Sequence, residues 1–247
     1  MIFFMSVILI SFSLMHAIEI ASFATRVAGR TSNRVALGTT LQQTIYTTSR
    51  FLLIPFLPML GFLVESGILV DTYLKLVLCA FLLTLLLAII VIIKLNSIQQ
   101  FFQIVFEKYT EDTIPIAIVK SFFNNDTIVE TKKCENFSLN KIVVKKTLVS
   151  LVAYLFLTTG FFIAFFLAII FPENRLTMSQ FTATFHGLGA VIFAFYLDPM
   201  LSRSIDSSKD EESWIKNVYS ILVGRALSYF VIILLLILYF LIEFFLY

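Results

Sequence analysis

Long apolar stretches separated by short polar segments make up most of this chain. A helix needs about 20 apolar residues to cross about 30 Å of hydrocarbon, and six stretches are long enough. Strands of a transmembrane barrel would alternate apolar and polar residues over segments of about ten residues, and the sequence has no such series. The pattern therefore predicts an all-α, polytopic membrane protein with about six transmembrane helices. We expect them at residues 2–25, 35–65, 72–95, 147–171, 177–197 and 217–245.

A polar segment at residues 96–146 separates two membrane halves, 1–95 and 147–247, with three predicted helices each. It carries mixed charge and contains two short amphipathic pieces, 98–109 and 114–123, of the kind that can lie along a membrane surface. We interpret it as a cytosolic connecting segment, too short and too polar to be an independent catalytic domain.

Prolines mark two places where a predicted helix should bend or end. Proline has no N–H and its ring clashes with the preceding turn, so Pro55 and Pro58 should kink the second helix. The pair Asp198-Pro199 should end the fifth helix and leave residues 202–213 as a polar loop. Within that fifth helix, small residues should let a neighbouring helix approach closely: Ala183, Gly187, Gly189 and Ala190.

Composition agrees with a membrane protein and offers little enzyme chemistry. Of the 247 residues, 59% are hydrophobic and 14% are charged, against about 25% charged in an ordinary soluble domain. Cys79 lies in an apolar run and Cys134 in a polar one, which indicates neither a disulfide framework nor a metal site. The sequence has no nucleotide-binding loop, metal cluster or nucleophilic triad, so we expect no cofactor.

The distribution of basic residues predicts an orientation. The segments after the first, third and fifth helices carry fourteen of the 18 Lys and Arg residues. Under the positive-inside rule these segments face the cytosol, and both termini lie outside. No basic segment precedes the first apolar run and no convincing cleavage site follows it, so we expect the first helix to be retained.

Arg50 is the charged residue that most needs explanation. A guanidinium at the centre of a membrane helix costs about 3 kcal/mol, so it usually marks a function. Helical spacing places a polar stripe on this otherwise apolar helix, formed by Gln43, Tyr46 or Thr47, and Arg50, with Ser49 beside them. Helix rise places Arg50 about 22 Å along its helix, where no carboxylate is expected at the same level. It could bind a phosphate in a polar cavity; alternatively it snorkels or caps carbonyls freed at the prolines.

Other polar groups within the predicted helices have plainer explanations. Glu19 and Arg225 each fall about 10 Å from the cytosolic boundary, which favours a structural salt bridge between two helices. For His16 and His186, each alone in its helix, a hydrogen-bonded packing role is favoured over proton relay. Asp198 would support the same intramembrane polar network.

Three arginines, Arg26, Arg30 and Arg34, surround the predicted turn after the first helix. They could set the topology or meet anionic lipid headgroups. Equally, they could gather a pyrophosphate at the cytosolic mouth of a transport path, and the sequence leaves both interpretations open.

Short motifs in both halves of the chain resemble one family. They are Arg26-x-Ala28-Gly29, Arg34-x-Ala36, Ser49-Arg50 with Pro58, Phe171-Pro172-Glu173-Asn174-Arg175-x-Thr177, and Leu197-Asp198-Pro199 with Ser202. In this order they are similar to the Amj family of bacterial lipid II flippases. The resemblance implies a multi-pass protein of the bacterial cytoplasmic (inner) membrane. It would move the undecaprenyl-pyrophosphate-linked cell-wall precursor, lipid II, from the inner to the outer leaflet.

The resemblance and the residues together predict a groove that replaces the water around the headgroup while the polyprenyl tail stays in lipid. The expected partners are lipid II and membrane lipid, with no nucleic acid; a homodimer is also open, since six helices enclose only a narrow groove. The alternatives are a membrane enzyme acting on a polyprenyl phosphate, or a scaffold subunit of an envelope-biogenesis complex. The candidate substrate-binding residues are Arg50, Arg26, Arg30, Arg34, Gln43, Thr47 and Ser49.

Overall fold

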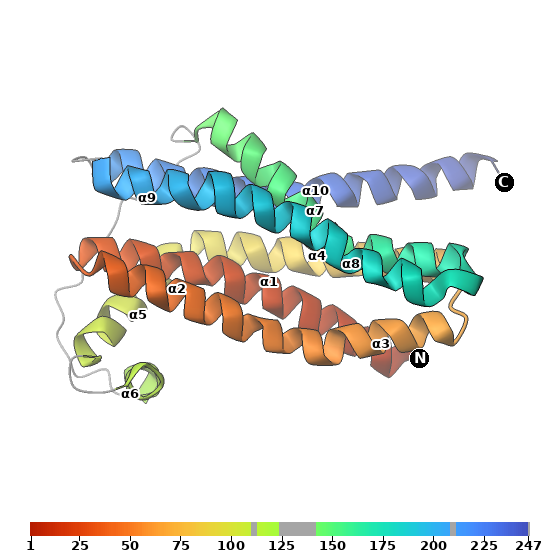
Figure 1. Ribbon diagram of the computed structural model, residues 1–247, viewed down its shortest axis with the longest axis horizontal. Helices are drawn as coiled ribbons and strands as arrows, with labels where there is room; N and C mark the ends of the chain where they lie inside the picture. Colours follow the sequence, from red (N-terminus) through yellow and green to blue (C-terminus); the bar gives the residue numbers. More distant parts are fainter. Residues whose placement is uncertain (110–112, 124–141, 208–210, 247) are drawn as a thin grey trace.

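The computed structural model describes residues 1–109, 113–123, 142–207 and 211–246, and within these ranges the chain is helical apart from short turns (Figure 1). Six helical stretches are long and apolar enough to cross a membrane, which confirms the predicted all-α, six-span architecture. These spans are Ile2–Thr31, Val35–Glu65, Val70–Ile93, Val144–Ile170, Pro172–Ser204 and Trp214–Leu246.

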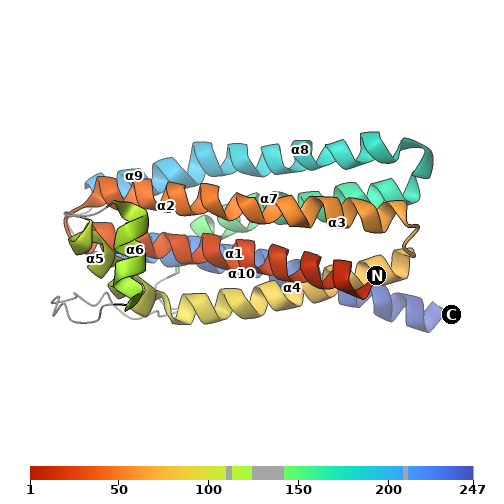
Figure 2. The same cartoon turned by 90° about the horizontal axis from the view of Figure 1, so that it is seen from below.

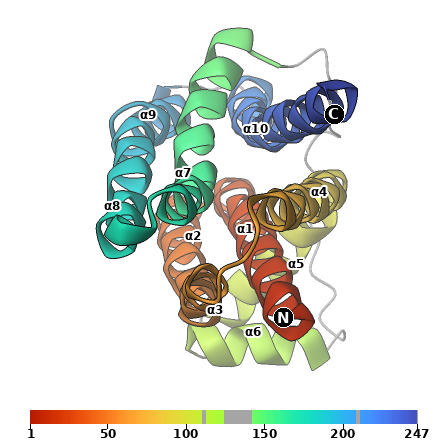
Figure 3. The same cartoon turned by 90° about the vertical axis from the view of Figure 1, so that its right-hand side faces the viewer.

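The spans run side by side along the long axis of the molecule (Figure 2). Both termini lie at one end, called here the terminal end, and α5 and α6 lie at the other, called the α5–α6 end. α1 packs against α2, α3 and α4, and α7 packs against α8 and α10; Figure 3 shows this grouping end-on. The bounds are α1 Ile2–Thr31, α2 Val35–Ser49, α3 Leu53–Glu65, α4 Val70–Ile93, α7 Val144–Ile170, α8 Arg175–Ile192 and α10 Glu211–Leu246.

The first helix is longer than the sequence suggested. It continues to Thr31, beyond the expected end at residue 25, because the charged side chains of its last turns find partners on other helices. The turn that follows is tight: Asn33 has a φ of 55°, a left-handed conformation that asparagine adopts more readily than most residues.

The second span is interrupted at Arg50. A 3-10 turn, η1 (Arg50–Leu52), separates α2 from α3, so the irregularity begins at the arginine itself, just before the prolines. Pro55 falls in the first turn of α3, where an N–H has no intrahelical partner, and Pro58 lies inside that helix.

The expectation that Asp198-Pro199 ends the fifth helix is wrong. α8 passes through a π turn, η4 (Phe193–Leu197), into α9 (Asp198–Ser207), so residues expected in a polar loop are helical up to Ser207. Pro199 is tolerated because it lies in the first turn of α9, where its missing N–H is not needed. Residues 208–210 of the expected loop lie outside the described residues.

The connecting segment holds the two short helices that its amphipathic pattern predicted. α5 (Leu95–Lys108) packs against α1, where Gln103 donates a hydrogen bond to the Thr31 hydroxyl at 2.6 Å. α6 (Ile114–Phe123) runs across the long axis of the bundle, as the side view in Figure 2 and the end-on view in Figure 3 both show. Residues 124–141 of this segment lie outside the described part of the chain.

Close helix packing in α8 depends on one of the predicted small residues. A Cβ added at Gly189 would lie 2.7 Å from the Ala153 carbonyl oxygen of α7, whereas one added at Gly187 would meet nothing within 4 Å. Gly189→Val is therefore expected to lower the free energy of unfolding by about 1–3 kcal/mol through overpacking. Thermal unfolding in detergent measures this, with Gly187→Val as the matched control; equal losses in both variants would contradict the packing explanation.

Candidate functional site

A buried ionic cluster joins three spans in the middle of the bundle. Glu19 on α1 is 2% exposed and accepts a hydrogen bond from Arg225 of α10. Its other carboxylate oxygen, Oε1, lies 3.1 Å from Nη2 of Arg50. The predicted pairing of Glu19 with Arg225 is confirmed, and Arg50 joins the same carboxylate.

Arg225 is held on several sides. Its Nε donates to the Tyr229 hydroxyl at 2.7 Å, and its guanidinium carbon lies 4.5 Å from the centre of the Tyr154 ring. His16 Nδ1 lies 2.7 Å from Arg225 Nη2, which makes that nitrogen an acceptor and the imidazole neutral. The favoured packing role of His16 agrees with this contact, because the ring helps to fix the arginine.

The expectation that Arg50 has no counter-ion is wrong. The predicted depth of Glu19 assumes a helix end at residue 25, but α1 ends at Thr31, and the six extra residues place Glu19 about 9 Å deeper. Glu19 then falls close to the level of Arg50, within reach of its long side chain.

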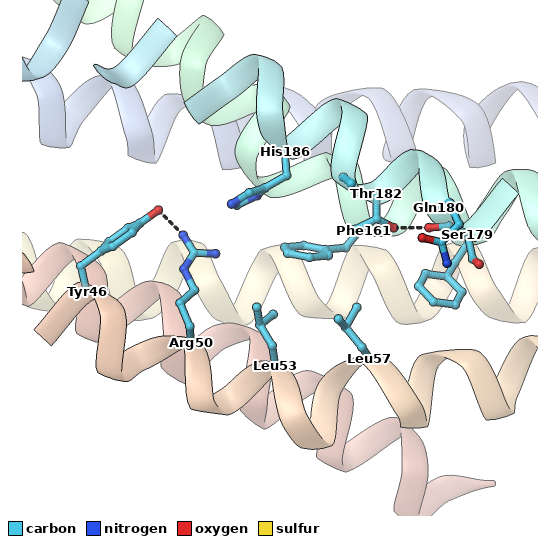
Figure 4. A pocket seen from close by; sticks show the side chains of 11 residues that line it. Tyr46, Arg50, Leu53, Leu57, Phe161, Ser179, Gln180, Thr182 and His186 are labelled. Atoms are coloured by element: carbon cyan, nitrogen blue, oxygen red, sulfur yellow. Dashed lines mark hydrogen bonds between the residues drawn. The ribbon is translucent and has the colours of Figure 1, made fainter. Parts of the chain in front are cut away.

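Arg50 also faces an open cavity, the arginine pocket. This pocket of about 520 Å³ lies between η1–α3 on one side and α7–α8 on the other (Figure 4). The guanidinium donates to the Tyr46 hydroxyl, and its side chain is 22% exposed. Polar groups of α8 face it across the pocket, where His186, Thr182, Gln180 and Ser179 line the wall together with apolar side chains.

α8 forms one wall of the arginine pocket while remaining apart from α2 and α3. It packs along α7, where Gly189 is its one buried residue, and much of its surface is exposed. Gln180 and Ala183 line the pocket and are themselves exposed. The pocket therefore opens sideways, between α8 and the α2–α3 pair, towards the surface that lipid would cover.

The comparison with protein families gives one decisive match. The Amj family, described as Alternate to MurJ, matches residues 12–241. The chain belongs to the Amj family. The comparison with curated proteins and the comparison with solved structures each gave no match.

In this Amj chain, Arg26 is a partner of Asp198 and not a member of an arginine cluster. Arg26 is 3% exposed, and its Nη2 donates to the Asp198 carboxylate at 2.6 Å. The π turn η4 immediately precedes Asp198 and belongs to the same continuous span. Sequence reasoning did not foresee this pair, since the two residues are 172 positions apart.

The other two arginines of the triplet engage different elements. The guanidinium carbon of Arg30 lies 5.4 Å from the centre of the Trp214 ring. Arg34 donates to the Phe106 carbonyl and lies 3.7 Å from the Glu107 carboxylate. The triplet therefore does not converge on one point, and its predicted role in gathering a pyrophosphate stays a prediction.

The residues of the polar stripe predicted on α2 lie in different environments. Gln43 lines a second cavity, described below, and Thr47 is exposed outside both cavities. Ser49 is buried and donates to the Tyr46 carbonyl at 2.7 Å, so it satisfies the backbone near η1. Arg50 and Tyr46 are the members of the stripe that face the arginine pocket.

Sequence reasoning missed the polar wall that α8 contributes. Ser179, Thr182 and His186 recur at spacings of three and four residues, which places them on one helix face. That periodicity was visible in the sequence, but which helix they face follows only from the packing. His186 also approaches the Leu157 carbonyl, with Nδ1 3.4 Å from the oxygen.

Proposed function

We propose that this chain is a flippase that carries lipid II from the inner to the outer leaflet of the bacterial cytoplasmic membrane. The observation that carries the proposal is the Arg50 guanidinium, placed midway along the bundle in a pocket that opens sideways. Membership of the Amj family supports it, because the family is described as an alternative to MurJ.

The charge of the buried cluster favours an anionic ligand. Arg50 and Arg225 bring two positive charges, Glu19 brings one negative charge, and His16 is neutral as an acceptor. One positive charge therefore stays uncompensated within the cluster, and of the two arginines Arg50 is the exposed one. A guanidinium offers five donors in a planar fork, so Arg50 can hold Glu19 with one edge and a phosphate with another.

The shape of the arginine pocket suits a polyprenyl diphosphate. A cavity of about 520 Å³ lies in the range of about 300–1,000 Å³ that encloses small ligands. The polar groups of α8 can replace part of the water around the headgroup, since desolvation without such partners is costly. The sideways opening leaves the tail in lipid throughout.

The basic residues support the orientation that this function needs. Those that the structure describes near the end of α1 and in α5 and α6 lie at the α5–α6 end (Figure 2), which the positive-inside rule would assign to the cytosol, and both termini would then lie outside. The headgroup would enter at the α5–α6 end and leave at the terminal end.

The test is outer-leaflet accessibility of lipid II in bacteria depleted of their other flippases. Expression of this chain is expected to restore labelling of lipid II at the cell surface, without release of inorganic phosphate. Failure to restore labelling at normal membrane abundance would overturn the proposal. Phosphate release or a shortened substrate would instead favour an enzyme acting on a polyprenyl phosphate.

A further inference from the structure

A second cavity lies next to the arginine pocket. This glutamine pocket has a volume of about 230 Å³ and lies nearer the α5–α6 end, because its α2 residues precede Arg50 on a helix that starts at that end. Gln42 and Gln43 of α2, Tyr154 of α7 and Asp198 at the start of α9 give it its polar and aromatic character. The contacts of Arg50 and Glu19 described above do not explain what the glutamine pocket does.

The two pockets are successive sections of one groove, because the same helices line both. On α7, Tyr154 and Leu157 face the glutamine pocket, and Phe161 and Phe165 face the arginine pocket. Spacings of three and four residues place all four on a single face of that helix. α2, through Tyr46, and α8 also line both cavities; α3 adds to the wall of the arginine pocket, and the π turn η4 adds to the wall of the glutamine pocket.

Tyr46 separates the two sections. It is a lining residue of both pockets, and its hydroxyl is held by Arg50. The Arg50 guanidinium carbon lies 4.5 Å from the centre of the Tyr46 ring, so the ring and the cation fill the groove at this level together. A headgroup moving along the groove must therefore displace Tyr46.

The chemistry of the glutamine pocket differs from that of the arginine pocket. Its charged lining residue, Asp198, is already compensated by Arg26, so this section offers no excess positive charge. Gln42 is 5% exposed and its amide oxygen has no hydrogen-bond partner in the described structure. Amide and carboxylate oxygens accept hydrogen bonds from hydroxyl groups, and the rings of Tyr46 and Tyr154 add flat apolar surfaces.

We propose that the glutamine pocket binds the sugar portion of the lipid-linked headgroup, and that Tyr46 is the gate between this pocket and the arginine pocket. The inference rests on the proposed function, and it assigns the two chemically different parts of the headgroup to different pockets. The uncharged, hydroxyl-rich sugar occupies the glutamine pocket while the diphosphate lies against Arg50.

The gate is tested by cysteine labelling, which does not depend on transport. In a Cys79→Ala, Cys134→Ala background, Gln43→Cys and Ser179→Cys should react with a membrane-impermeant maleimide from opposite faces of the membrane. Adding Tyr46→Ala should make Gln43→Cys reactive from both faces, while Tyr46→Phe keeps the ring and the barrier. Tyr239→Ala, at an exposed position of α10 outside both pockets, is the control.

The gate is refuted if Gln43→Cys and Ser179→Cys react from the same face, or if Tyr46→Ala leaves the reactivity of Gln43→Cys unchanged. The sugar assignment is tested in proteoliposomes, where lipid II should slow labelling of Gln43→Cys and undecaprenyl diphosphate, which has no sugar, should not. Equal protection by both lipids would overturn it. Cysteine labelling reports access to the pockets and does not require transport. A failure of the proposed function would instead appear in the lipid II accessibility assay, so the two failures can be distinguished.

Discussion

Replacing Arg50 with alanine is expected to abolish translocation of lipid II while the protein still folds and inserts. The substitution removes the exposed cation of the arginine pocket, yet Glu19 keeps its partner Arg225 and so is not left as a lone buried charge. Loss of one partner of a buried charge pair costs about 2–5 kcal/mol of binding, which is a factor of about 30 to several thousand in affinity.

Graded variants at Arg50 separate charge from geometry. Arg50→Lys keeps the charge without the planar fork and should retain part of the activity, whereas Arg50→Gln should behave like Arg50→Ala. Lys75→Gln is the matched control, because Lys75 forms an exposed ion pair with Asp71 away from either pocket. The measurement is surface labelling of lipid II at equal membrane abundance. Full labelling with Arg50→Ala would remove the main support for an anion-binding pocket.

The second large effect concerns stability. Arg225→Met is expected to lower the free energy of unfolding by about 3–5 kcal/mol, because it removes the fully buried partner of Glu19 and leaves that carboxylate to Arg50, which is partly exposed. The Tyr229 hydroxyl would lose its hydrogen bond at the same time. Thermal unfolding in detergent, followed by loss of helical circular dichroism or by aggregation, gives the measurement.

A double substitution distinguishes a lost charge partner from lost packing. Glu19→Gln together with Arg225→Met removes the buried charges as a pair and should recover much of the stability lost by Arg225→Met alone. Simple addition of the two single losses would show that Glu19 and Arg225 do not depend on each other. Lys75→Met serves as the control for loss of an exposed cation and should change stability little.

The fold could be predicted from the sequence because the spans are long and strongly apolar. The Glu19 and Arg225 pair was also predictable, since each charge needs a partner within the membrane. The position of Asp198 was not, because a proline after it indicates a helix end, and only the π turn before it shows why the helix continues. A π turn has no sequence signature comparable to a proline.

The candidate site was predicted only in part, because the depth of Glu19 and the neighbours of α8 could not be obtained from the sequence. Arg50 was identified from its charge alone, and Tyr46 from its place on the same stripe. The link from Arg50 to Glu19 was missed because an error of six residues in the end of α1 shifts the depth by about 9 Å. The contribution of α8 depended on which helices lie beside it, and the order of the spans along the chain does not determine that.

The shared carboxylate of Glu19 has an electrical consequence. The empty cluster carries one net positive charge, and under the proposed function a diphosphate with one negative charge on each phosphate would reverse that sign when it binds. An electric field across the membrane exerts a force on a charge in proportion to its size. Moving one elementary charge through 100 mV changes its energy by about 2.3 kcal/mol. A membrane potential that is negative inside would therefore pull the empty cluster, with its positive charge, towards the cytosol. It would push the cluster with bound diphosphate, which is negative, towards the outside, and the proposed transport cycle needs both directions.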